Sequence, residues 1–222
     1  MSKKPHDYYK RWYEAYAKMF VENIYNKSWR NCFSMKEKPD LQSETLNVGI
    51  EVTSSLASNM YSIQHAFNEY IDKEKSEETL EKIVKKAGSN AIFQTKPLAV
   101  GLHWDHDIQD INGLINIIED KTSNKLPHYR HYEKNMLYIF TQNSFFSTSD
   151  IKRVWKELKD IFFDRSLKYD FYFIDCIEKV FTLNADDGSI VKYNVSQDEM
   201  NKLNEEAMRI AMEYNSFDVK YK

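Results

Sequence analysis

Glycine is scarce in this chain of 222 residues, and its spacing excludes two common kinds of nucleotide site. The five glycines stand at positions 49, 88, 101, 113 and 188, and no two of them are closer than 12 residues. A Walker A loop and a Gly-x-Gly-x-x-Gly dinucleotide loop both need several glycines within one short segment. The sequence therefore excludes nucleotide chemistry that depends on either loop.

Cysteine and long apolar runs are also in short supply. The two cysteines, Cys32 and Cys176, are too few for a disulfide framework or a zinc ligand set. Nowhere do 18 uncharged apolar residues follow one another, and the basic start of the chain lacks the apolar stretch of a signal peptide. We therefore expect a cytoplasmic protein with no membrane partner.

Positive charge is not in excess, since 31 Lys and Arg residues face 34 Asp and Glu residues, for a net charge of −3. Contact with nucleic acid would therefore depend on a local patch. The first candidate patch consists of Lys82, Lys85 and Lys86; the second consists of Lys121, Lys125, His128, Arg130 and His131, with Tyr129 and Tyr132 among them. Such a mixture of cations and rings suits a phosphate backbone or unpaired bases, although a solvated helix end has the same composition.

Apolar residues make up 42% of the chain and aromatic residues 14%, which is enough for a packed core in a single domain over residues 1–222. Helical and strand periodicities alternate, which predicts an α/β fold with a central mixed β-sheet flanked by helices. We expect an N-terminal helix at about 7–25, a core at about 38–176, and a C-terminal hairpin and helix at about 179–213. Within these limits, helices are predicted at 58–87, 108–126, 147–163 and 197–213, and strands at 39–43, 47–53, 97–104, 136–140, 168–176 and in a hairpin at 179–193.

Two acidic residues stand on the first two predicted strands. Because alternate side chains of a strand face opposite ways, Glu51 shares the polar face of its strand with Gly49 and Thr53, and Asp40 shares that of its neighbour with Gln42. If the strands pair, these side chains converge, with Gly49 leaving room beside them. Neighbouring carboxylates in a partly buried place need a shared proton or a divalent cation, and oxygen ligands favour Mg²⁺ or Mn²⁺.

The residues Pro39-Asp40 and Glu51-Val52-Thr53 resemble the motif of the PD-(D/E)xK, or restriction-endonuclease-like, nuclease superfamily. This resemblance implies a restriction-endonuclease-like core in which Asp40, Glu51 and the backbone carbonyl of Val52 bind the metal ion. It also implies a Mg²⁺-dependent (or Mn²⁺-dependent) phosphodiesterase that acts on DNA in preference to RNA. An acidic residue on the preceding helix is frequent in this superfamily, and Glu14 and Glu22 are the candidates, with solvated helix charge as the alternative for each.

Thr53 departs from this motif, because the superfamily has a lysine there that orients the attacking water and offsets negative charge. Lys121 and Lys125, which extend the apolar stripe of the predicted helix at 108–126, are the candidates to replace it. Lysines at a helix end also interact with the helix dipole and cover apolar surface, so a structural role is the alternative.

Two other functions remain open at this stage. Loss of the motif lysine is also consistent with a catalytically inactive protein that uses the nuclease fold to bind protein or nucleic acid. A histidine-based metalloenzyme would require the pairs His103/His106 and His128/His131 to meet in space.

Overall fold

The computed structural model of the chain describes residues 5–54, 92–96, 99–103, 111–141, 146–162, 168–176 and 178–217. The chain divides into two compact units, one formed by Met1–Ser55 with Ile111–Lys222 and the other by Leu56–Asp110. The expectation of a single domain stays a prediction. The predicted helix at 58–87 lies outside the described residues.

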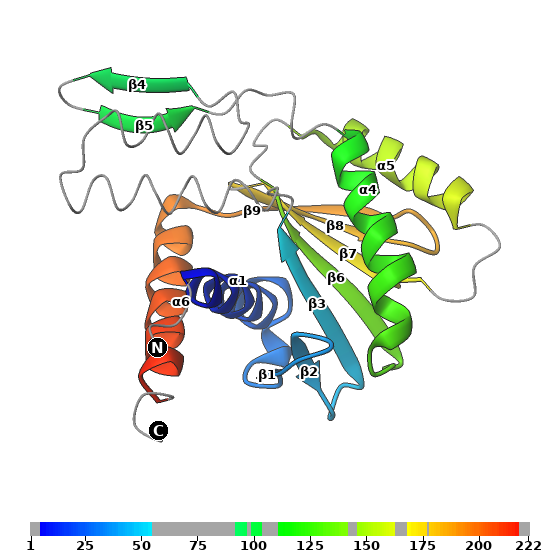
Figure 1. Cartoon of the computed structure of the whole chain (residues 1–222). Helices are drawn as coiled ribbons and strands as arrows, with labels where there is room; N and C mark the ends of the chain where they lie inside the picture. Colours follow the sequence, from blue (N-terminus) through cyan, green and yellow to red (C-terminus); the bar gives the residue numbers. More distant parts are fainter. Residues whose placement is uncertain are drawn as a thin grey trace. The chain divides into compact units, whose positions relative to one another are not determined.

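The larger unit is built on a seven-stranded mixed sheet with the strand order β1-β2-β3-β6-β7-β8-β9, which confirms the predicted α/β class (Figure 1). The strands are β1 (Ser34–Met35), β2 (Leu41–Ser43), β3 (Val48–Ser54), β6 (Lys134–Phe140), β7 (Phe171–Asp175), β8 (Lys179–Asn184) and β9 (Ile190–Asn194). The three central strands β3, β6 and β7 are parallel, and the remaining pairs are antiparallel. A parallel centre requires both faces of the sheet to be covered.

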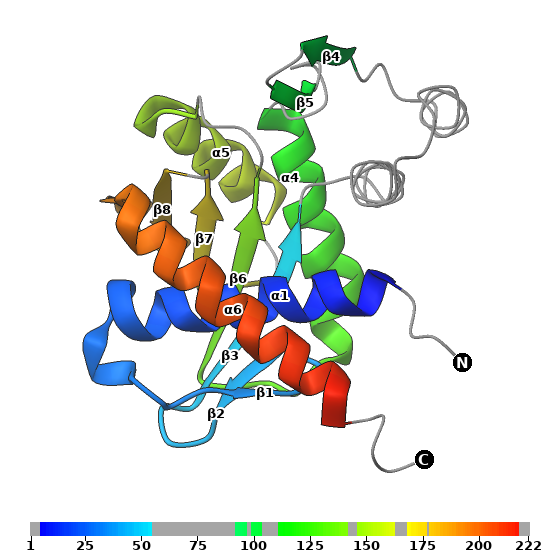
Figure 2. The ribbon, with the colours of Figure 1, turned by 90° about the vertical axis from the view of Figure 1, so that its left-hand side faces the viewer.

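Helices cover both faces of this sheet, as Figures 1 and 2 show. On one face lie α1 (Pro5–Phe20), which continues into a π-helical turn η1 (Val21–Tyr25), and α6 (Gln197–Phe217). On the other face lie α4 (Ile111–Asp120), extended by a π-helical turn η4 (Lys121–Lys125) and a 3-10 turn η5 (Leu126–His128), and α5 (Thr148–Ile161). No helix in the described part of the chain has the length and apolar character needed to cross a membrane.

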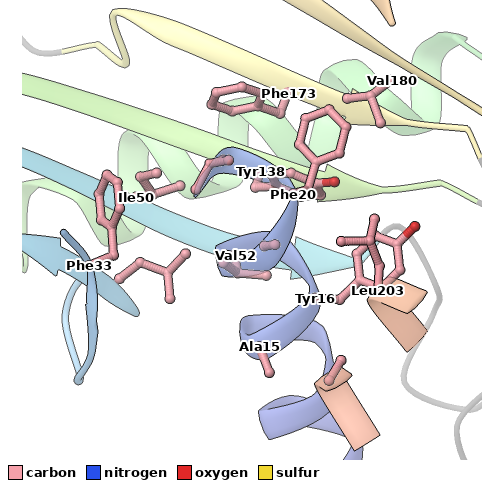
Figure 3. Close-up of a cluster of buried hydrophobic side chains, with 14 of the residues drawn as sticks. Ala15, Tyr16, Phe20, Phe33, Ile50, Val52, Tyr138, Phe173, Val180 and Leu203 are labelled. Atoms are coloured by element: carbon pink, nitrogen blue, oxygen red, sulfur yellow. The ribbon is translucent and has the colours of Figure 1, made fainter. Parts of the chain in front are cut away.

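The core under α1 and α6 is formed by the apolar side of the central strands (Figure 3). Ile50 and Val52 of β3 lie on this side with Tyr138 of β6, and they pack against Phe20 of α1 and Leu203 of α6. The ring of Tyr138 stacks on that of Phe173 in β7, at 5.5 Å between ring centres. The predicted alternation of β3 therefore places its apolar side chains against the first and last described helices.

The core under α4 and α5 uses the opposite side chains of the same strands. Leu137 of β6 and Tyr172 of β7 pack there against Ile118 of α4 and Leu158 of α5. Because Glu51 pairs with Leu137, and Leu137 with Tyr172, these three residues form one row across the parallel centre. Glu51 therefore points toward the α4 side of the sheet, at the edge of this second core.

The smaller unit contains a two-stranded antiparallel hairpin of β4 (Ile92–Lys96) and β5 (Ala99–His103), with Gln94 opposite Gly101. β5 corresponds to the strand predicted at 97–104, whereas neither β4 nor the short β1 was expected from the sequence. The hairpin predicted at 179–193 is confirmed by β8 and β9, and Gly188 in the turn between them has a positive φ of 71°.

The sequence suggested that Gly49 leaves open space beside the acidic pair, but this expectation was wrong, because other side chains fill the space. A Cβ atom at this position would lie 2.6 Å from Cδ2 of Tyr132 and 2.8 Å from Cγ of Pro39. Gln42, opposite Gly49 in the ladder, is also occupied, since its amide donates to the carbonyl of Pro39 and its oxygen accepts from the hydroxyl of Tyr132. These two positions therefore hold the turn before β2 in place.

We predict that Gly49→Ala lowers the free energy of unfolding by about 1–3 kcal/mol, because the added methyl group overpacks a filled site. Because glycine inside a strand is otherwise less favourable than alanine, a lower free energy of unfolding in Gly49→Ala can be attributed to the clash. Urea denaturation measures the change, and Thr53→Ala, on the same face but partly exposed, is the control. Wild-type stability of Gly49→Ala would contradict this packing.

Candidate active site

Asp40 and Glu51 are brought together where β2 separates from β3. Leu41 pairs with Ile50 in the antiparallel ladder, so Asp40 comes opposite Glu51 at the next position. The chain turns away there, and Oδ2 of Asp40 accepts a hydrogen bond of 2.9 Å from the backbone N–H of Val52. The Asp40 carboxylate thus takes the place of a backbone carbonyl of β2 as the acceptor for this N–H, which fixes it next to Glu51. Both side chains are buried.

Glu51 is held from the α4 side of the sheet. The ammonium group of Lys121 donates to Oε1 of Glu51 at 2.8 Å, and the hydroxyl of Tyr129 donates to the same oxygen, also at 2.8 Å. Lys121 is the first residue of the π-helical turn that extends α4, and Tyr129 follows the 3-10 turn after it. The end of α4 therefore supplies both donors.

Asp40 is approached from the other side by α1. The ammonium group of Lys10 lies 3.6 Å from Oδ1 of Asp40, 3.4 Å from Oε1 of Glu14 and 2.9 Å from Oε2 of Glu37. Arg11 contacts both glutamates as well, at 2.7 Å from Glu14 and 3.1 Å from Glu37. Glu14 is 1% exposed, so α1 adds a third buried carboxyl group to the site.

The pKa values of all three carboxyl groups are raised. Burial, with the neighbouring charge of Asp40, raises the pKa of Glu51 to about 7, against the opposing effect of Lys121 and Tyr129. Burial and the charge of Glu14 raise the pKa of Asp40 to about 6, although the Val52 N–H and the nearby lysines act to lower it. Burial likewise raises the pKa of Glu14. Burial is therefore the main reason that these carboxyl groups release their protons less readily than in water.

The donor set suits a hard divalent cation, because buried carboxylate oxygens with raised pKa values gain from added positive charge. Oε1 of Glu14 supports this fit: it is buried and has no hydrogen bond, although the Lys10 ammonium lies 3.4 Å away. No three His, Cys, Asp or Glu side chains in the described ranges are arranged as a ready metal site. Each carboxylate of the pair instead lies against an ammonium group, Asp40 against Lys10 and Glu51 against Lys121.

The other residues singled out from the sequence lie in different surroundings. Lys125 ends the π-helical turn, is exposed, and has no ion pair with Asp40 or Glu51. Thr53 is partly exposed on β3. Glu22 is buried and fixes a loop, since it accepts from the N–H of Phe33 at 2.9 Å and from Lys18 at 2.7 Å. Solvated helix charge therefore describes neither Glu14 nor Glu22.

The aromatic residues of the second basic patch contact protein groups. The hydroxyl of Tyr129 is bonded to Glu51 and that of Tyr132 to Gln42, while the guanidinium of Arg130 makes two 2.6 Å bonds to Glu44. Tyr132 is 6% exposed, so its ring is not a free stacking surface. Within the patch, Lys125, His128 and His131 are exposed.

Two of the sequence-based alternatives lie at least partly outside the described residues. Lys82, Lys85 and Lys86 of the first basic patch are among the residues not described. His103 ends β5 in the smaller unit and His106 lies outside the described ranges, so a meeting of the two histidine pairs stays a hypothesis.

Sequence reasoning did not identify Lys10 or Tyr129 as part of the site. The signal for Lys10 was its position four residues before Glu14, which places the two on one helix face. Tyr129 follows two irregular turns, and no periodicity relates it to Glu51.

Comparison of the sequence with protein-family models and with curated proteins gave no match.

We predict that the contribution of the acidic pair to the free energy of unfolding falls as the pH rises from about 4 to about 7. The ordinary pKa values of Asp40 and Glu51 are 3.8 and 4.5, and their pKa values in the folded protein are about 6 and about 7. In this window the pair binds more protons in the folded protein than in the unfolded chain, so raising the pH removes stability that the pair provides. Urea denaturation at several pH values measures the decline.

Asp40→Asn/Glu51→Gln should abolish most of this decline and be more stable than the wild type at pH 8. Glu133→Gln, at an exposed position, is the matched control and should leave the pH dependence unchanged. A double variant that keeps the wild-type slope would show that the acidic pair is not its source.

Proposed function

We propose that this protein is a Mg²⁺-dependent phosphodiesterase that acts on DNA, built on a restriction-endonuclease-like core. The observation that carries the proposal is the convergence of the buried Asp40 and Glu51 from neighbouring strands, with the ammonium of Lys121 on Glu51. The mixed sheet with helices on both faces is the architecture that the motif resemblance implies. RNA is the second choice of substrate, because the motif resemblance implies an enzyme that acts on DNA in preference to RNA.

Asp40, Glu51 and the backbone carbonyl of Val52 would hold the cation. When bound there, Mg²⁺ supplies charge neutralisation and lowers the pKa of water. The hydrogen bond from the Val52 N–H fixes the direction of the Asp40 carboxylate. Tyr129 does the same for Glu51, so both acidic groups are oriented before a substrate arrives.

Lys121 takes the role that Thr53 cannot perform. A threonine hydroxyl carries no charge, whereas the Lys121 ammonium lies 2.8 Å from Glu51 and is partly exposed. From this position it can donate a hydrogen bond to a phosphate oxygen or to the attacking water, and it offsets negative charge. The lysine thus enters from the end of α4 instead of from β3.

We expect the purified protein to nick supercoiled plasmid DNA in the presence of Mg²⁺ or Mn²⁺ and to lose this activity on chelation. Asp40→Asn and Glu51→Gln should each lower the nicking rate by roughly 10²–10³-fold, since each removes one of the two carboxylates that would bind the Mg²⁺ ion. Both variants relieve buried charge and should remain folded. Nicking that is equal in all three proteins would refute the assignment.

Lys121 and Lys125 form a matched pair on one helical turn. Lys121→Met should lower the nicking rate by about 10²-fold or more, while Lys125→Met should retain most of it, because Lys125 does not contact the acidic pair. Rates at saturating Mn²⁺ separate a catalytic loss from weaker cation binding. Equal effects of the two substitutions would remove Lys121 from the mechanism.

A second function is favoured by one observation: Lys10 and Lys121 already lie against the two carboxylates. An acidic pair neutralised within the protein, together with Thr53 at the motif position, fits an inactive nuclease fold that binds protein or nucleic acid. Calorimetric titration with Mn²⁺ distinguishes the two functions, since an active site gives heat and a rise in Tm. Absence of both would favour the binding module.

A further inference from the structure

Three buried side-chain atoms in the described part of the chain have no hydrogen-bond partner: Oε1 of Glu14, Oγ1 of Thr122 and the hydroxyl of Tyr169. Such atoms are rare in native proteins, because a buried polar group without a partner loses its bonds to water and gains nothing in return. Their grouping is informative. Two of the three, those of Glu14 and Tyr169, lie near the acidic pair.

Glu14 shares the ammonium of Lys10 with Asp40, and Thr122 follows Lys121 directly in the chain. Tyr169 lies in the segment that leads into β7 and is 1% exposed. Burial raises the pKa of its hydroxyl, and the charge of Glu51 and the nearby Tyr129 hydroxyl raise it further. The unpartnered atoms of Glu14 and Tyr169 therefore lie near the pair from α1 and from the segment that leads into β7.

The position of Tyr169 follows from the row of residues across the sheet. Glu51 of β3, Leu137 of β6 and Tyr172 of β7 are in register and face the same side. The ring of Tyr169 packs edge to face on that of Tyr172, at 6.3 Å between ring centres, and belongs to the same buried cluster as Leu137. Tyr169 thus approaches the acidic site from within the second core.

Three other tyrosine hydroxyls in the described part of the chain have protein partners. Tyr129 donates to Glu51 at 2.8 Å, Tyr132 to Gln42 at 2.8 Å and Tyr138 to Asp175 at 2.7 Å. Tyr169 has the same chemistry and similar burial to Tyr138 but no such bond. A phenylalanine would fill this core position without an unpaired hydroxyl, so the hydroxyl points to a partner that is not part of the chain.

We propose that Tyr169 is a positioning residue of the cation site, whose hydroxyl gains its hydrogen-bond partner when a hydrated divalent cation binds between Asp40 and Glu51. This inference rests on the proposed cation site but not on cleavage of DNA. Hydrogen bonds of this kind orient the groups around a metal ion, and their loss typically weakens metal binding by about 10–100-fold. Tyr169 acts here through the acidic pair and not on a substrate.

The test compares Tyr169→Phe with Tyr138→Phe, the same substitution at a hydroxyl that already has a protein partner. Calorimetric titration with Mn²⁺ gives the affinity, and thermal unfolding in EDTA gives the stability without a cation. Tyr169→Phe should bind Mn²⁺ about tenfold more weakly while its Tm in EDTA is equal to or above that of the wild type. Tyr138→Phe should show the reverse, a lower Tm and unchanged Mn²⁺ affinity, because it removes a donor from the buried Asp175.

Equal Mn²⁺ affinity of Tyr169→Phe and the wild type would overturn the inference. A lower Tm of Tyr169→Phe in EDTA with unchanged affinity would also overturn it, since the hydroxyl would then hold a structural water. Failure of the proposed function gives different results. A wild-type protein that binds no Mn²⁺ would refute the cation site and the inference together, whereas one that binds Mn²⁺ without cleaving DNA would refute cleavage alone. Mn²⁺ binding without cleavage, weakened by Tyr169→Phe, would support the inference and refute only the nuclease proposal.

Discussion

The electrostatic repulsion between two carboxyl groups held out of water is the constraint on which the rest of this structure depends. Asp40 and Glu51 lie where β2 leaves β3, and burial raises the pKa of both, with a neighbouring carboxylate adding to the effect in each case. Positively charged groups approach the pair from both faces of the sheet: Lys10 on α1 and Lys121 at the end of α4. The two helical layers therefore do more than bury apolar side chains, because each carries a counter-charge to the same edge of β3.

Much of the fold could be predicted from the chain, because its strands obey simple periodicities. The alternation in β3 correctly assigned Ile50 and Val52 to one core and Glu51 to the other face. The short β1 was missed, since two residues carry no periodicity. The π-helical turn at the end of α4 was missed as well. Its wider turn changes which side chains share a face, and nothing in an apolar stripe signals that change.

The same turn explains why the sequence could not separate Lys121 from Lys125. In a regular α-helix residues four apart share a face, but in the π-helical turn only Lys121 meets Glu51. Gly49 was misjudged for another reason: the ring that covers it comes from Tyr132, far along the chain, and such long-range packing leaves no local trace. The burial of Glu14 was missed because charge pattern alone does not distinguish a solvated ion pair from one enclosed by tertiary packing.

The packing of α1 against α6 ties the acidic site to distant parts of the described sequence. The helix that brings Lys10 and Glu14 to the acidic pair is the first described element, whereas α6, against which it packs, is the last. Contacts between the first and the last described helix therefore hold in place the helix that carries Lys10 and Glu14. A truncation that removed α6 would loosen this side of the acidic site, although α6 itself contributes no charge to it.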